Sequence, residues 1–185
     1  MKLNEADIPT ADQLVDELNR LEVHFLQGGT GCPVTEPLEP AILLAMLATS
    51  NEARLQLALL PLLLRHPDFA HVVCQVAEQL PPPTQVVLKC YYTAAQLLQQ
   101  KYCMRIQTLF GYSTVLPNLF MAELGLPTFF NPDHGLQMLA ERHRLLSGRA
   151  INWLGTYEHG AQRLLTHCER RQLWRKSQPI KSEPC

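Results

Sequence analysis

The sequence has little charge and few aromatic residues, and it lacks a long uninterrupted apolar segment. Charged residues make up 18% and aromatic residues 7% of the 185 positions, and the formal net charge is −1. With so small a net charge, overall composition predicts no particular partner. Apolar residues reach 46%, and a chain of this length buries roughly 70% of its unfolded surface, so it needs no disulfide or metal ion to fold.

No segment has the length expected of a membrane-spanning helix, which requires about 20 consecutive apolar residues. The two richest runs, AILLAMLA (41–48) and LQLALLPLLL (55–64), are separated by TSNEAR. That separator matches a capping box between Thr49 and Glu52, which predicts that a second helix begins there. Pro61 should kink this second helix or end its first part. We therefore expect two short, mostly buried helices and no membrane partner, with an exposed partner-binding face as the alternative.

The cysteines and the N-terminal segment indicate the compartment. The six cysteines form no CxxC pair, and the first 20 residues are acidic and polar, without the apolar core of a signal peptide. The chain is therefore expected in the cytoplasm, where a reducing environment would leave most of these thiols as small core residues. The cysteines are Cys32, Cys74, Cys90, Cys103, Cys168 and Cys185.

Apolar residues recur with helical spacing along nearly the whole chain, and no convincing pair of strands occurs. This pattern predicts an all-α fold: a single globular bundle of about seven or eight helices, with HEAT-like stacking as the alternative. One domain is expected over 1–176, with a first helix at 10–26, a linker at 27–37 and a helical core at 38–176. The tail, 177–185, is expected to be disordered.

Prolines, glycines and capping residues predict where the core helices begin and end. The two phenylalanines of the TFF segment that precedes Asn131 should plug the core. The predicted core helices after the leucine-rich runs are 67–80, 84–110 with a break near Tyr102, 116–127, 131–148 after an Asn131 cap, and 149–175.

Sequence signatures of catalysis and of metal or phosphate binding are missing. No GK[ST] follows the glycines of QGGTG, and neither HExxH nor GxSxG occurs. His159, His167 and Cys168 cannot share one ion unaided, because residues eight apart on a helix are separated by about 12 Å along its axis. No catalytic residue, cofactor or metal site is therefore predicted.

One group of residues leaves room for a helical enzyme or a small-ligand-binding protein. Tyr91, Tyr92, His143 and Trp153 would form such a site if a polar pocket lay among them.

Charge is distributed unevenly along the chain. Residues 1–80 hold four Lys and Arg against eleven Asp and Glu, whereas residues 81–185 hold twelve against six. Either the two halves complement each other within one fold or dimer, or the basic end meets an anion. The possible acidic partner face consists of Asp12, Asp16, Glu17 and Glu22. The possible partner or nucleic-acid contacts on the last helix are Arg163, Arg170, Arg171, Trp174, Arg175 and Lys176.

Two segments carry a resemblance to known proteins. EARLQLALLPLLLRHPDFAHVV, with its LLLRHP turn, and LPNLFMAELGLP, with its ELGLP turn, resemble a group of small all-helical bacterial proteins encoded beside minimal nucleotidyltransferase-like proteins in two-gene modules. The resemblance covers about residues 50–165 and transfers no catalytic residue to this chain. It implies a binding or regulatory role toward a partner rather than catalysis.

Together these features predict a non-catalytic cytoplasmic interaction or regulatory protein that binds a protein partner or itself. The first alternative is a nucleic-acid-binding regulator that uses the basic C-terminal helix, with Trp174 stacked on a base. The second is the helical enzyme or small-ligand-binding protein described above.

Overall fold

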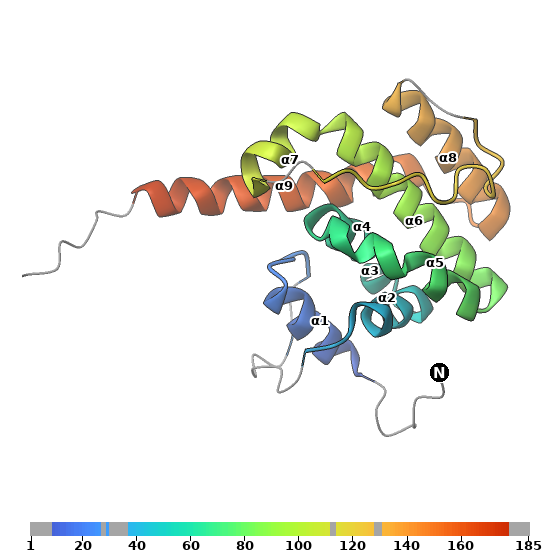
Figure 1. Ribbon diagram of the computed structural model, residues 1–185, viewed down its shortest axis with the longest axis horizontal. Helices are drawn as coiled ribbons and strands as arrows, with labels where there is room; N and C mark the ends of the chain where they lie inside the picture. Colours follow the sequence, from blue (N-terminus) through green and yellow to red (C-terminus); the bar gives the residue numbers. More distant parts are fainter. Residues whose placement is uncertain (1–8, 27–28, 30–36, 112–113, 128–130, 178–185) are drawn as a thin grey trace, which may run out of the picture.

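The fold is an all-α helical bundle, which confirms the predicted fold class (Figure 1). The computed structural model describes residues 9–26, 29, 37–111, 114–127 and 131–177, and no strand occurs among them. The helices are α1 (Ala11–Arg20), α2 (Pro40–Thr49), α3 (Ala53–Leu57), α4 (Leu59–Arg65), α5 (Ala70–Gln79), α6 (Pro82–Lys101), α7 (Cys103–Phe110), α8 (Pro132–Ser147) and α9 (Trp153–Ser177), with a 3₁₀ helix at Pro67–Phe69.

The centre of the bundle is α6, which packs against α2, α4, α5, α7, α8 and α9. A helix with neighbours on every side belongs to a bundle rather than to a linear stack of helix pairs. Its interior residues, from Leu88 to Gln99, are almost all buried. The long last helix, α9, runs past the body, and its C-terminal end projects beyond it (Figure 1).

The leucine-rich run lies in the core, as expected. Leu59, Leu60, Leu62, Leu63 and Leu64 are all fully buried. The helix is interrupted at Ala58, which separates α3 from α4. Pro61 lies in the first turn of α4, where its missing N–H removes the bond that would continue α3.

Among the described residues, no single helix is both long and apolar enough to cross a membrane. Two consecutive segments, Ala53–Arg65 and Pro67–Gln79, would be long and apolar enough only if they were taken together, and their axes are bent by 104° relative to each other.

The first helix is shorter than the predicted 10–26. It begins as a capping box, in which the Thr10 side chain accepts from the Gln13 N–H. It ends at Arg20, because Glu22 adopts a left-handed conformation (φ 58°) and the Val23 N–H donates to the Leu18 carbonyl at 2.8 Å. This is a Schellman ending with Glu in the position that glycine usually takes, so no glycine marks the end of the helix in the sequence.

The predicted helix over 116–127 is wrong. The segment forms a turn, in which the Leu126 N–H donates to the Met121 carbonyl at 2.8 Å and Gly125 takes a left-handed φ of 69°. Its apolar residues are nevertheless buried, because a segment this short between two prolines can fill the core without a regular helix. The phenylalanines of TFF lie outside the described residues.

Two further boundaries differ from the prediction. The predicted capping box between Thr49 and Glu52 does not form. Thr49 ends α2, and its hydroxyl donates to the Ala45 carbonyl at 2.8 Å, while the Glu52 N–H donates to the Ser50 side chain. The last helix begins at Trp153 rather than near 149, because the Asn152 side chain accepts from the Gly155 N–H at 3.0 Å.

The thiols are more exposed than expected. Cys90 is buried and Cys168 is half-buried, but Cys74 and Cys103 are exposed. All four are free thiols; Cys32 and Cys185 lie outside the described residues.

Candidate functional site

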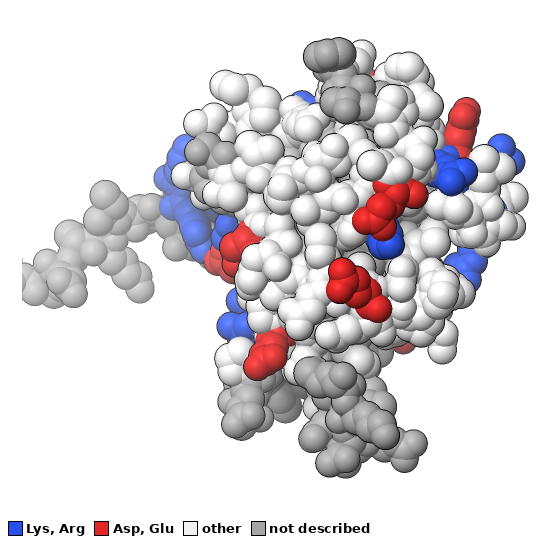
Figure 2. Space-filling model, turned by 45° about the vertical axis from the view of Figure 1, so that its right-hand side comes forward, with Lys and Arg blue, Asp and Glu red and all other residues white. Residues whose placement is uncertain are grey.

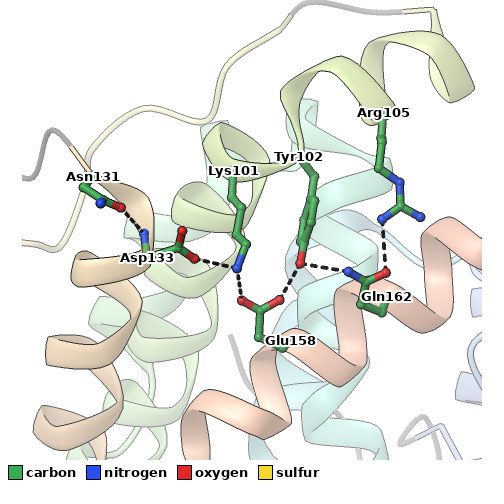
Figure 3. Close-up of polar contacts among 7 residues, drawn as sticks. All are labelled: Lys101, Tyr102, Arg105, Asn131, Asp133, Glu158 and Gln162. Carbon is green, nitrogen blue, oxygen red and sulfur yellow. Dashed lines mark hydrogen bonds and ion pairs between the residues drawn. The ribbon is translucent and has the colours of Figure 1, made fainter.

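The two acidic residues of α9, Glu158 and Glu169, contact residues of α6 and α7. Figure 3 shows the network around Glu158. Lys101 Nζ donates to Glu158 Oε1 at 2.5 Å and pairs with Asp133 Oδ1 at the same distance. Burial alone would lower the pKa of Lys101, but the hydrogen bonds to both carboxylates outweigh it and raise that pKa above its usual value. Glu158 is therefore neutralised inside the bundle.

The same network continues along α7 (Figure 3). The Tyr102 hydroxyl donates to Glu158 Oε2 at 2.5 Å and accepts from Gln162 Nε2 at 2.9 Å. Arg105 donates to Gln162 at 3.1 Å and, through Nε, to Glu169 at 3.0 Å. Both carboxylates of α9 are thus matched by cations of α6 and α7, which leaves the arginines of α9 uncompensated by their own helix.

The other side of α9 forms an open pocket of about 810 Å³ with the segment that ends α1. We call it the basic pocket. Among the residues that the structure describes, no Asp or Glu contributes to its lining. The lining residues are Asn19, His24, Leu26, His159, Gln162, Arg163, Thr166, His167, Arg170 and Arg171.

Two histidines face each other across this pocket. The rings of His24 and His167 lie 5.3 Å apart, and the Asn19 side chain contacts His24 Nδ1 at 3.2 Å. Burial, and then the charge of Arg171, lower the pKa of both histidines below the ordinary value. His167 Nε2 is buried and has no hydrogen-bond partner among the described residues. An anion placed here would supply both an acceptor and the missing negative charge.

The arginines are held by packing rather than by carboxylates within the pocket. The Arg163 guanidinium lies 5.1 Å from the centre of the Phe25 ring, a cation–π geometry. Among the described residues, Arg163, Arg170 and Arg171 form no ion pair. The pKa of Glu22 is lowered mainly by its hydrogen bond from Arg65, and the charge of Arg171 adds to this effect.

Of the six residues predicted on the basic helix, three line the pocket and three lie beyond it. Trp174 is 65% exposed, and Arg175 and Lys176 are exposed beside it on the projecting end of α9. Figure 2 shows Lys and Arg atoms along the side from which the chain end projects and others at the opposite edge, whereas the face toward the viewer is mainly uncharged.

The predicted acidic face does not form as one exposed surface. Glu17 is fully buried, and its carboxylate accepts from Arg20 at 2.6 and 2.9 Å. Glu22 pairs with Arg65. Asp12 is exposed and Asp16 is half-buried. The spacing placed Glu17 off the apolar stripe, but its ion pair allows it to enter the interior.

The sequence interpretation missed the histidines of the pocket. It considered His159 and His167 as metal ligands and not as part of an anion site. Among the described residues no three His, Cys, Asp or Glu side chains are grouped to hold a metal ion. The available signal was the four-residue spacing of His159, Arg163, His167 and Arg171, which places all four on one helix face.

The aromatic residues singled out in the sequence come together in part. Tyr91, His143 and Trp153 line a second cavity of about 330 Å³. Tyr92 does not take part, because its hydroxyl donates to the Pro117 carbonyl at 2.9 Å.

Comparison with family models, curated proteins and solved structures gave no match. The functional argument therefore depends on the geometry of the site.

Proposed function

We propose that the protein is a non-catalytic interaction protein that binds an acidic segment of a partner protein in the basic pocket. The observation that carries this proposal is the composition of the pocket: within the described part of the chain, three arginines and three histidines line it and no carboxylate does. Arginine binds carboxylates well, because its planar guanidinium donates two parallel hydrogen bonds.

The charges of α9 support this proposal. Its carboxylates, Glu158 and Glu169, already pair with Lys101 and Arg105 on the opposite side. A partner carboxylate would meet the arginines without competition from acids on the same helix. Most of this attraction is between exposed groups, so association should weaken steeply as salt rises above about 0.1 M.

The shape of the basic pocket favours a protein segment over a nucleic acid. A nucleic-acid backbone carries regularly spaced phosphates and is usually bound along an extended basic groove. Here the uncompensated lining arginines, Arg163, Arg170 and Arg171, span only about two turns of one helix. A few carboxylate side chains of a partner fit that extent.

A single-stranded nucleic acid is the second candidate, and one observation favours it. Trp174 is 65% exposed one turn after Arg170, with Arg175 and Lys176 next to it. An exposed indole among cations is suited to stack on a base while the cations meet phosphates.

Fluorescence anisotropy with two labelled probes, an oligoglutamate peptide and oligo(dT), tests the two candidates. The double variant Arg170→Gln/Arg171→Gln should weaken peptide binding about tenfold or more. The matched control is Arg144→Gln, which removes an exposed arginine of α8 outside the basic pocket. Equal peptide affinity for the double variant and the control would contradict the proposal.

The variant Trp174→Ala separates the two ligands. Peptide binding should persist, because Trp174 does not line the pocket. Loss of oligo(dT) binding in this variant, together with no peptide binding by the unmodified protein, would favour the nucleic-acid candidate. Substitution is preferable to truncation after Thr166, which would also remove the contacts of Glu169 and Gln172 with α7.

A further inference from the structure

A second cavity, of about 330 Å³, lies where α9 begins. It is bordered by the end of α2, the first half of α6, the end of α8 and the start of α9, and we call it the aromatic cavity. Val86, Val87 and Leu146 give it apolar walls, and Arg149 lies at its border. Its volume is at the lower end of the range of small-molecule sites.

His143 is the most unusual residue of this cavity. Its side chain is 1% exposed, and its ring stacks on Trp153 with centroids 3.6 Å apart and planes 18° apart. Its Nδ1 lies 2.6 Å from the Tyr157 hydroxyl. The rings of Tyr91 and His143 pack edge to face, with their centroids 5.9 Å apart. Contacts on three sides fix the orientation of the imidazole.

The surroundings decide which nitrogen carries the proton. Burial raises the pKa of Tyr157 well above its usual value, so the phenol keeps its proton. Burial, and then the charge of Arg149, lower the pKa of His143 to about 4, so the imidazole is neutral near pH 7. Among the described residues the Tyr157 hydroxyl has no other acceptor than His143 Nδ1. We therefore assign the hydroxyl as the donor to Nδ1, which places the His143 proton on Nε2.

That Nε2–H has no acceptor among the described residues, and neither does the indole Nε1–H of Trp153. Both atoms are buried, and a buried donor without an acceptor costs roughly 1–3 kcal/mol. His143 lines the cavity, and its Nδ1 is already occupied by Tyr157, so Nε2 is the ring nitrogen that remains for a ligand. Two N–H donors on parallel rings thus lie beside one cavity that has a cation at its border.

We propose that the aromatic cavity binds a small organic monocarboxylate. One carboxylate group accepts hydrogen bonds from His143 Nε2–H and Trp153 Nε1–H, with Arg149 supplying the balancing charge. The apolar part of the ligand packs on Val86, Val87 and Leu146. This site is separate from the basic pocket, since no residue lines both.

The test follows the indole N–H signals of the ¹⁵N-labelled full chain by NMR during titration with phenylacetate. The protein has two tryptophans, and a Trp174→Phe sample identifies which signal belongs to Trp153. We expect the Trp153 signal to move downfield and to saturate at millimolar phenylacetate, while the Trp174 signal stays in place. The neutral analogue 2-phenylethanol should bind at least about tenfold more weakly.

Two substitutions test the donors and the charge. His143→Phe should abolish the shift, and His143→Gln, which keeps an N–H donor near the position of Nε2, should restore part of it. Arg149→Gln alters an exposed side chain and so leaves the core intact; it should weaken binding several-fold, whereas the control Arg144→Gln should not. An unmoved Trp153 signal, or equal binding of phenylacetate and 2-phenylethanol, would overturn the proposal.

Discussion

Acidification should destabilise the protein through His143, by an amount that follows from the structure. The buried imidazole has a pKa of about 4 in the folded protein, mainly because burial disfavours its charged form. In the unfolded chain it should titrate near the ordinary value of about 6.5. Between these two values the unfolded chain binds a proton at this residue that the folded protein does not.

The sign and size follow from proton linkage. Well above the unfolded pKa both states hold a neutral imidazole, so His143 adds no pH dependence. As pH falls from about 6.5 to 4 the unfolded state gains the proton, and the free energy of unfolding decreases. The full loss is about 3 kcal/mol, and between about pH 7 and pH 5 it is about 2 kcal/mol.

Urea unfolding followed by circular dichroism, at about pH 7 and pH 5, measures this loss. His143→Phe removes the titrating group; it leaves the Tyr157 hydroxyl without its acceptor, a cost that is the same at both pH values. His24 and His167, whose pKa values are also lowered, contribute equally to both proteins. The wild-type protein should therefore lose about 2 kcal/mol more than the variant. Equal losses in the two proteins would show that His143 does not cause the pH dependence.

Three further predictions follow from other parts of the molecule. Gly148→Ala and Gly111→Ala should each lower the free energy of unfolding by about 1 kcal/mol, which thermal denaturation measures. Both glycines have a left-handed backbone, with φ of 65° and 70°, and neither site has, among the described residues, a neighbouring atom that an added Cβ would meet. Lys101→Met should cost about 1–3 kcal/mol in urea unfolding, because its half-buried carboxylate partner on α9 loses its cation. In anisotropy titrations, oligoglutamate should bind more tightly as pH falls from about 7 to 6. The pKa values of His24 and His167 are lowered in the free protein, and a bound anion raises them, so binding and protonation favour each other. Binding that does not change with pH would contradict the pocket assignment.

Much of the fold was predictable from local signals. The break near Tyr102, the end of α3 ahead of Pro61 and the cap at Asn131, whose side chain accepts from the Asp133 N–H at 2.9 Å, all agree with residue type. The early end of α1 at Arg20 was not predictable in this way. Its left-handed residue is Glu22, which the ion pair to Arg65 and the burial of the next residue, Val23, hold in place.

The candidate sites were predictable only where the contacts lie on one helix. The spacing on the last helix grouped Arg163, Arg170 and Arg171 correctly. His24 joins them only because the chain turns at Glu22 and returns toward α9, and a contact between residues so distant in the sequence has no local signal. The same limit applies to the aromatic cavity, which needs the ends of three helices to meet.

The charge of α9 shows why net charge says little about binding in this protein. Counted along the sequence, Glu158 and Glu169 weaken the case for a basic surface, since they lie on the same helix as its arginines. In space they point the other way and are matched by Lys101 and Arg105. A helix that directs its acids inward and its bases outward presents a local positive field even in a chain of net charge −1. Removing an inward acid should therefore destabilise the packing of α9 on α7 far more than it strengthens the basic pocket, because that acid is already neutralised.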